Sequence, residues 1–372
     1  MILTGRIPGR KGLWEIQLQA ANIVAMGCID AGFAGVETDW ITPGLFDIQV
    51  NGCLGIDFAD PKITCESLAV AEGVLGKHGI SLYCPTVVTR DKQSILGTLA
   101  VFDKAWDRGL IPRAMGIHLE GPYISSLDGY RGVHQSEFVR DPDWDEFTQF
   151  QECCGGRIRM VTLAPERPRA RSFIEKAVAS GVIVAIGHTA AEDKDIAAAV
   201  DCGATISTHL FNGSAQLIDR HRNVIYAQLA EDRLYASLIA DGHHIPLSTF
   251  KVAVRAKGVD RVILASDLTY LAGLPEGEYT TENRSVVMRD SGVWVKDAPL
   301  LAGAATTLER DVEILARQPE PGIEAALLCA TRVPAQALKC EDLFELEAGR
   351  TGPLVVFGWR DGKLEIKTRI GF

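Results

Sequence analysis

The sequence predicts an α/β protein: a (β/α)8 barrel of the TIM type, with a small β-sandwich domain built from the two chain ends. Eight short runs rich in β-branched and apolar residues each end in a polar cluster. They are nearly continuous rather than alternating, which is typical of strands buried on both faces of a parallel sheet. The runs are GLFDIQVNG (44–52), GISLYCPTVVTR (79–90), AMGIHLEGP (114–122), RIRMVTLAPE (157–166), GVIVAIGHTA (181–190), GATISTHLFNG (203–213), LYASLIADGHH (234–244) and RVILASDLTY (261–270).

Helix-like segments lie between most of these runs. They carry apolar residues at three- and four-residue spacing, and several end in glycine, a common helix stop. We therefore expect the barrel to occupy residues 43–339, with an inserted hairpin or lid at 271–299. The segments are CESLAVAEGVLGKHG (65–79), DKQSILGTLAVFDKAWDRG (91–109), ARSFIEKAVASG (170–181) and AEDKDIAAAVDCG (191–203).

The two ends of the chain do not fit the barrel pattern. Residues 1–42 and 340–372 contain short strand-like runs with turns, and RDGK (360–363) is a hairpin signal. The simplest account pairs both ends in one small β-domain beside the barrel.

The composition excludes several classes of protein. The net charge of −10 argues against nucleic acid as a partner. No apolar run approaches the roughly 20 residues of a membrane span, and the N-terminus lacks a secretory signal pattern. The nine cysteines are odd in number and show no repeated CxxC spacing. We therefore expect a cytoplasmic protein with no membrane association.

Polar residues gather at the carboxyl ends of the predicted strands, where the active site of a (β/α)8 barrel lies. Five of the eight histidines fall in these positions. A single histidine there would more often be a hydrogen-bonded structural residue, but five at the ends of four different strands favour a site. The strand-end residues are Gln49, Asn51, His118, Glu120, Glu166, His188, His209, Asp241, His243, His244 and Asp267.

One carboxylate and two imidazoles among these residues form a natural metal-ligand set: Glu120, His188 and His209. They suit Zn²⁺ or another divalent first-row metal and leave a position open for water. Such a metal lowers the pKa of its bound water to about 7, so that water becomes the nucleophile. Asp267 would be the general base and acid. The alternatives are that Asp267 caps the following segment and that Glu120 pairs with an arginine.

The motifs together resemble the N-acetylglucosamine-6-phosphate deacetylases of the amidohydrolase superfamily. The resemblance runs from about Pro43 into the C-terminal tail, where LFELEAGRTGPLVVF is similar to the family's closing segment. In order, the motifs are PGLFDIQVNG, GIHLEGPYI, RGVH, VTLAPE, GHTAA, THLFNG, IADGHH, the strand that carries Asp267, LAGAATTL and ATRVPAQAL.

The resemblance implies further roles. His134 of RGVH would help the metal to polarise the acetamide carbonyl. Asn212 and Gly213 lie where the family contacts the sugar phosphate, and His244 would also contact the substrate. In such enzymes an arginine from the neighbouring subunit of a dimer holds part of the phosphate, and Arg220 lies at the matching offset. A homodimer acting on an amino sugar phosphate is therefore implied.

Two segments depart from the family pattern. The family usually reads THLFNAMPP followed by REPG, whereas this chain reads THLFNGSAQLIDRHRN (208–223). The crowded Arg220, His221 and Arg222 could still bind an anion, or the segment could serve another N-acyl amino sugar. The base strand also differs, since SDLTYLAGLP (266–275) stands where TDAT or a similar run is expected.

The leading hypothesis is hydrolysis of N-acetylglucosamine 6-phosphate to glucosamine 6-phosphate and acetate. A second hypothesis is deacetylation of an unphosphorylated or modified N-acyl amino sugar. A third is an inactive barrel that acts as a binding protein, which the presence of the ligand trio and Asp267 disfavours.

The first strand bears on the number of metals. Many amidohydrolase barrels carry His-x-His there and hold a second ion, but here the positions are Gln49 and Asn51. Neutral amides compete poorly with imidazole for Zn²⁺, although they hydrogen-bond well in a polar site. The sequence therefore predicts one divalent metal per chain, zinc first, with iron, cobalt or manganese as alternatives.

Overall fold

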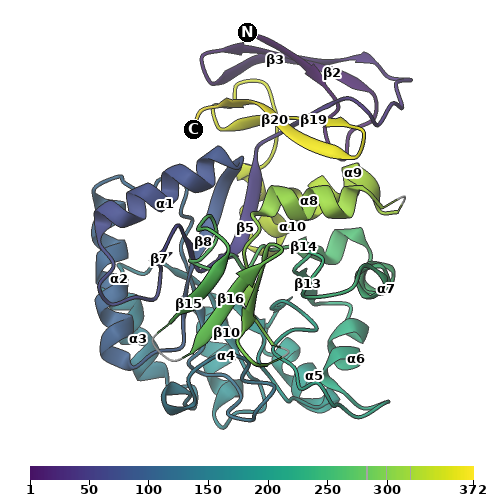
Figure 1. Ribbon diagram of the computed structural model, residues 1–372. Coiled ribbons are helices and arrows are strands. Elements are labelled where there is room, and N and C mark those ends of the chain that lie inside the picture. The colour runs from purple at the N-terminus through teal and green to yellow at the C-terminus, as the bar shows by residue number, and fades with distance from the viewer. Residues whose placement is uncertain (282–283, 299, 319) are drawn as a thin grey trace.

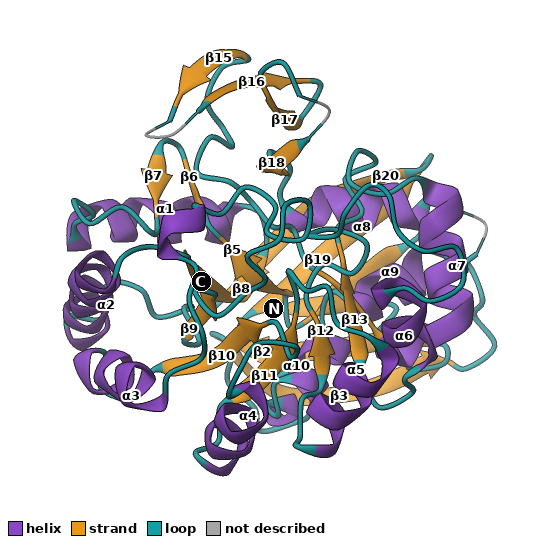
Figure 2. Cartoon of the chain, turned by 90° about the horizontal axis from the view of Figure 1, so that it is seen from below, coloured by secondary structure: helices purple, strands orange, loops and turns teal. Residues whose placement is uncertain are grey.

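The computed structural model describes residues 1–281, 284–298, 300–318 and 320–372. Its centre is an eight-stranded parallel sheet in the order β14-β13-β12-β11-β10-β9-β8-β5 (Figures 1 and 2). A parallel bridge between Val50 and Leu268 links its two edges, so the predicted barrel is confirmed. The strands are Leu45–Val50 (β5), Ile80–Val88 (β8), Ile117–Glu120 (β9), Ile158–Leu163 (β10), Ile183–Ile186 (β11), Ile206–Ser207 (β12), Tyr235–Leu238 (β13) and Val262–Leu264 (β14).

Helices follow the strands and cover the outside of the barrel. Side-chain caps start several of them: Asp91 accepts from the amide of Ser94, and Thr64 forms a capping box with Ser67. The four predicted helices are present as α1, α2, α4 and α5. The helices are Cys65–Lys77 (α1), Lys92–Asp107 (α2), Trp144–Cys153 (α3), Ala170–Ala179 (α4), Asp193–Asp201 (α5), Val224–Ala230 (α6), Leu247–Lys257 (α7), Leu308–Ala316 (α8), Gly322–Cys329 (α9) and Arg332–Ala337 (α10), with 3-10 turns at Ser136–Phe138, Val259–Arg261 and Glu341–Leu343.

Two apolar clusters hold the barrel together. The larger one lies between the strands and the surrounding helices. The smaller one joins residues of β5, β8, β10, β11, β12 and β14 to Val333 and Ala337 of α10. Because strands from around the whole sheet meet in this second cluster, it fills the inside of the barrel, and α10 closes that end. The polar site is left for the opposite end, at the carboxyl ends of the strands.

The two chain ends lie together beyond one end of the barrel (Figure 1). Ile2–Gly5 (β1), Leu13–Gln19 (β2) and Asn22–Asp30 (β3) form one sheet, and Asp39–Thr42 (β4) pairs with the hairpin Leu354–Arg360 (β19) and Lys363–Ile370 (β20) in another. A shared apolar cluster joins the two sheets. The expected small β-sandwich is therefore present, and we keep domain limits of 1–42, 43–339 and 340–372 as a proposal.

The inserted segment is larger than the expected hairpin. It is an antiparallel four-stranded sheet of Gly277–Thr280 (β15), Ser285–Arg289 (β16), Gly292–Val295 (β17) and Leu301–Ala304 (β18). Figure 2 shows this sheet on the same side of the barrel as the short strands β6 and β7. These are Gly52–Cys53 (β6) and Ile56–Asp57 (β7). Residue 299, the expected end of the insert, lies outside the described residues.

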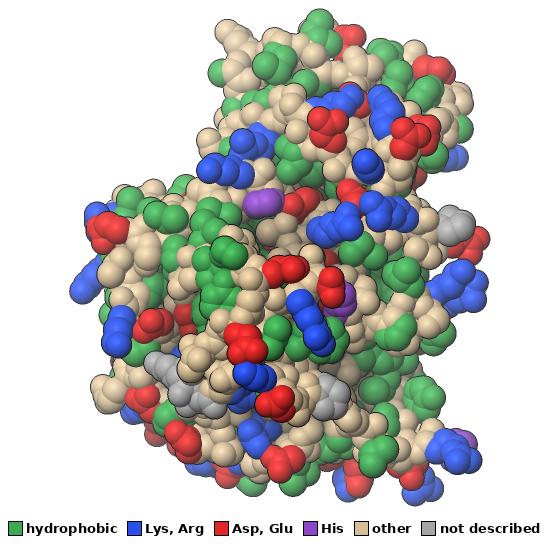
Figure 3. Space-filling view, viewed as in Figure 1, with side chains coloured by type: hydrophobic (Ala, Val, Ile, Leu, Met, Phe, Trp, Pro, Cys, Tyr) green, Lys and Arg blue, Asp and Glu red, His purple; other side chains and the backbone are tan. Residues whose placement is uncertain are grey.

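The surface carries charges of both signs. Figure 3 shows acidic and basic side chains interspersed over one face, the basic ones not merging into a single patch. None of the helices in the described part of the chain combines the length and the apolar character that a membrane span requires.

A pH-dependent contact links α1 to α8. Nδ1 of His78 lies 2.5 Å from Oε1 of Glu309, and this hydrogen bond raises the pKa of His78 above its ordinary value, against burial and the charges of Arg369 and Lys77. A raised folded-state pKa stabilises the fold below the unfolded pKa of about 6.5, and the gain is lost as pH rises through the folded value. We expect His78→Ala to lower the melting temperature more at pH 6 than at pH 8.5. Thermal melts at both pH values check this, and an equal loss at both would contradict it.

Candidate metal centre and active site

A cavity of about 680 Å³ opens at the carboxyl ends of the barrel strands, where the sequence placed the site. Its floor carries polar side chains from several strands, and part of its wall comes from the inserted sheet. The floor residues include Asn51, Glu120, His188, His209 and Asp267, and the inserted sheet adds Thr280, Val286, Val293, Trp294 and Leu301, with Thr281 and Arg284 from the β15–β16 connection.

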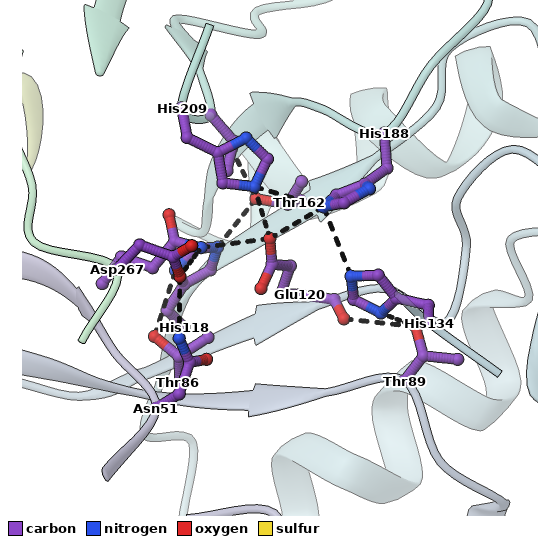
Figure 4. A network of polar contacts seen from close by, with 12 residues as sticks. Asn51, Thr86, Thr89, His118, Glu120, His134, Thr162, His188, His209 and Asp267 are labelled. Carbon is purple, nitrogen blue, oxygen red and sulfur yellow. Dashed lines mark hydrogen bonds and ion pairs between the residues drawn. The ribbon is translucent and has the colours of Figure 1, made fainter. Parts of the chain in front are cut away.

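Glu120 is the centre of the polar network (Figure 4). Its Oε1 lies 2.9 Å from Nε2 of His209 and 3.3 Å from Nε2 of His188, and it accepts from Nε2 of Gln49 at 3.1 Å. Burial alone would raise the pKa of Glu120, but its interactions with His188 and His209 hold it well below its ordinary range. The alternative pairing of Glu120 with an arginine is wrong for the described residues.

The histidine tautomers indicate a cation site. Nδ1 of His188 lies 3.0 Å from the carbonyl oxygen of Tyr130, which can only accept, so Nδ1 carries the proton. Thr89 Oγ1 donates to the carbonyl of Glu120 and therefore accepts from Nδ1 of His134, at 2.9 Å. The Nε2 atoms of His134 and His188 then carry no proton, and their electron pairs face one another across 3.3 Å. A metal ion bound between the two nitrogens would accept both electron pairs.

The distances also fit a metal. Ligands bound tetrahedrally to Zn²⁺ at about 2.0 Å lie about 3.3 Å apart. In the predicted trio of Glu120, His188 and His209 the three separations are 2.9, 3.1 and 3.3 Å. Glu120, His134 and His188 also offer ligand atoms within 4.8 Å of one another. The structure therefore brings His134 into the cluster as a fourth candidate donor.

Without a metal, a proton holds the trio together. The pKa of His209 is raised: burial lowers it, but the hydrogen bond to Glu120 and the Glu120 charge outweigh burial. A cation bound at Nε2 of His209 would displace the proton from that nitrogen.

Three site residues have strained backbones. His188 (φ 49°), His209 (φ 30°) and Asp267 (φ 50°) lie in the left-handed region, which non-glycine residues rarely adopt. Such strain is concentrated at functional sites, where the surrounding fold holds it in place. Gly213 leaves room for the His188 ring, because a Cβ there would lie 2.8 Å from Nδ1.

The first-strand amides bind the predicted base. Oδ1 of Asp267 accepts from Nδ2 of Asn51 at 2.7 Å and from Nε2 of Gln49 at 3.0 Å. Asp267 caps no helix in the described chain, so that alternative is wrong. Burial, and then the nearby charge of Glu120, raise the pKa of Asp267. A raised pKa brings a carboxylate closer to the range in which it can both take and return a proton at neutral pH.

The predicted substrate contacts fall into two groups. Asn212, Gly213 and His244 line the cavity, and Nδ1 of His244 lies 2.6 Å from Oδ2 of Asp241. Arg220 is exposed and is not among the described residues that line the cavity of its own chain.

Two strand-end residues have positioning or structural contacts. His118 is fully buried beneath the site, with Nε2 2.7 Å from Thr162 Oγ1, and it does not line the cavity; burial lowers its pKa to about 4. Glu166 accepts from Thr189 Oγ1 at 2.5 Å and from the Ala190 amide at 2.8 Å, so it fixes the loop that follows His188.

Sequence reasoning missed Thr89, Arg284 and Trp294, which all line the cavity. Thr89 lies near the carboxyl end of the predicted run 79–90, a signal that could have been used. Arg284 and Trp294 belong to the insert, where a hairpin or lid was expected, but the sequence does not indicate which of its side chains reach the site.

Comparison with known proteins gives one consistent result. No protein-family model matches the chain. The chain is 32% identical over 344 residues to the N-acetylglucosamine-6-phosphate deacetylase of Danio rerio, covering 88% of this chain and 83% of that protein. It is 30% identical to the N-acetylgalactosamine-6-phosphate deacetylase of a Shewanella species, covering 86% and 79%. The crystal structure of N-acetyl-D-glucosamine-6-phosphate deacetylase from Mycobacterium smegmatis superposes with a TM-score of 0.88 at 28% identity, covering 100% and 98%.

Proposed function

Because this chain belongs to the N-acetylglucosamine-6-phosphate deacetylase family, we propose that it hydrolyses N-acetylglucosamine 6-phosphate to glucosamine 6-phosphate and acetate. The observation that carries the proposal is the convergence of Glu120, His188, His209 and Asp267 at the floor of one cavity. A convergent carboxylate–imidazole set beside a buried carboxylate base is the equipment of metal-assisted amide hydrolysis. The presence of the whole set disfavours an inactive binding protein.

The residues divide the work of the reaction. A divalent cation held by Glu120, His188 and His209 would acidify a water molecule and polarise the amide carbonyl. Asp267 takes the proton of the attacking water as a C–O bond forms, then delivers it to the amine nitrogen as the C–N bond breaks. Gln49 and Asn51 both donate to Oδ1 of Asp267, which leaves Oδ2 for the proton.

His134 stabilises the oxyanion in this proposal. The role requires the other neutral tautomer of the ring, in which Nε2 carries the proton and Nδ1 accepts from Thr89 Oγ1. Burial, followed by the neighbouring His188, lowers its pKa to about 3, so the ring is neutral at pH 7. We expect His134→Asn to lower kcat by about 10²–10³-fold while the bound metal stays at one ion per chain. Elemental analysis beside the assay checks this. If metal is lost along with activity, His134 is a ligand and the oxyanion role is wrong.

We assign one divalent ion to each chain, zinc first, with iron, cobalt or manganese as alternatives. The support is the amide of Gln49, whose Nε2 donates to both Glu120 and Asp267. These N–H donors fill the space between the two carboxylates, and a donor cannot ligate a cation.

We propose a homodimer in the cytoplasm. The loop that carries the exposed Arg220 also presents Leu217, whose side chain is 92% exposed. An apolar tip beside an arginine suits insertion into a neighbouring subunit. All nine cysteines are free, which suits a reducing compartment.

Two features of the substrate need a finer test: whether the 6-phosphate is required, and which amino sugar carries the acetyl group. The departures in residues 208–223 and the relative that acts on N-acetylgalactosamine 6-phosphate keep another N-acyl amino sugar as the second candidate. The test is acetate release from the 6-phosphates of N-acetylglucosamine and N-acetylgalactosamine and from the two free sugars. We expect the glucosamine 6-phosphate derivative to have the highest kcat/KM. A preference for a free sugar would overturn the proposal.

A further inference from the structure

Arg284 is a cation on the cavity wall that pairs with no acidic side chain of the described residues. It lies between β15 and β16 of the inserted sheet, is partly buried and lines the cavity. Its Nη2 donates to the carbonyl oxygen of Val133 at 2.7 Å. No carboxylate of the described residues forms an ion pair with it. Arg90, the other arginine among the described lining residues, differs, because its Nη2 lies 3.5 Å from Oδ2 of Asp57.

The Val133 contact fixes the side of the cavity on which Arg284 lies. The loop from Gly129 to His134 packs against residues 213–215: a Cβ at Gly129 would lie 2.8 Å from Cα of Ala215. Gly132 and Gly213 both approach the His188 ring: a Cβ at Gly132 would lie 3.0 Å from its Cε1, and a Cβ at Gly213 would lie 2.8 Å from its Nδ1. Arg284 therefore lies on the part of the cavity rim where residues 129–134 meet residues 213–215.

This rim offers hydrogen-bond donors in need of acceptors. Nδ2 of Asn212 is buried, and no partner for it exists among the described residues, although Asn212 lines the cavity. The guanidinium of Arg284 can only donate. Burial, and then the charge of Arg131, lower the pKa of Arg284, which indicates that its cation is poorly compensated by the protein itself. A ligand rich in acceptor oxygens and carrying negative charge satisfies all of these groups.

We propose that Arg284 and Asn212 form an anion subsite that binds the phosphate of the amino sugar 6-phosphate within a single chain. This inference rests on the proposed function and adds to it a cation from the same chain. It stands beside the partner-subunit arginine that the resemblance implies, since Arg284 lines the cavity of its own chain.

The test compares Arg284→Ala and Arg284→Lys with the unaltered protein. We expect Arg284→Ala to raise KM for N-acetylglucosamine 6-phosphate by about 10- to 100-fold with kcat changed less than threefold, because a forked charge-assisted contact is lost. Arg284→Lys should recover part of the loss. The inhibition constant of glucosamine 6-phosphate should rise in parallel with KM, whereas that of glucosamine should not change.

A purely structural role for Arg284 predicts something else. If it only fastens the insert to the His134 loop, kcat falls and inhibition by both amines weakens equally, which overturns the subsite. The matched control is Lys296→Ala, which removes an exposed cation of the same inserted sheet that pairs with Glu278 outside the cavity lining. It should leave KM unchanged.

The outcomes separate this inference from the proposed function. If the unaltered protein releases no acetate from any amino sugar phosphate, the function itself fails. If it does, and Arg284→Ala keeps the original KM while Arg220→Ala raises it, only the single-chain subsite is wrong.

Discussion

Asp267→Asn is expected to lower kcat by about 10²–10⁴-fold, the usual contribution of a positioned general acid–base group. The substitution keeps an Oδ1 acceptor for the amides of Asn51 and Gln49, which are 2.7 and 3.0 Å away. It replaces Oδ2 by an amide nitrogen that cannot take a proton. The change therefore removes the base and retains the local hydrogen bonds. Steady-state assays with metal content measured on the same sample check the result.

The matched control is Asp311→Asn. Asp311 is fully buried, accepts from Thr306 Oγ1 at 3.3 Å and does not line the cavity. Burial raises its pKa well above the ordinary value, and an amide has nearly the same size and shape as the carboxyl group. Near-normal kcat in this control with undiminished kcat in Asp267→Asn would show that Asp267 is not the base.

Glu120→Gln is expected to remove the stoichiometric metal and lower kcat/KM by about 10³-fold or more. The variant loses the only carboxylate of the predicted ligand trio, and metal Lewis acidity contributes several kcal/mol to such reactions. It also leaves His209 without the charge that fixes its Nε2, 2.9 Å away. Elemental analysis and a titration with Zn²⁺ measure the loss.

Glu72→Gln is the control for this second change. Glu72 is also buried, but it accepts from the Arg113 amide at 2.9 Å and does not line the cavity. It should keep one metal per chain. A Glu120→Gln protein that retains both metal and activity would contradict the assignment of Glu120.

Much of the fold could be predicted because its strands are buried on both faces. Runs such as residues 181–190 are apolar up to their polar ends, and glycine stops follow helices such as α1. Helix α9 lacks such a signal. Its GIEAALLC sequence is apolar on nearly every face, so no helical period is visible. The size of the inserted sheet was missed because its strands are only four or five residues long.

The site shows where residue type alone is insufficient. His118 and Glu120 are two residues apart on one strand, so their side chains point to the same face of the sheet. Along the strand they are about 6.6 Å apart. Only the structure shows that His118 lies below the cavity floor, against Thr162. His134 lies in a loop. The sequence shows that the residue is there, but only the structure shows that its Nε2 lies 3.3 Å from Nε2 of His188.

The central claim is that one bound metal ion per chain enables acetamide hydrolysis. The direct test removes metal with a chelator, restores Zn²⁺ in steps and measures acetate release from N-acetylglucosamine 6-phosphate against ions bound per chain. We predict activity that rises in proportion to occupancy and levels off at one ion. Full activity in the metal-free protein, or a rise that continues to two ions, would contradict the account.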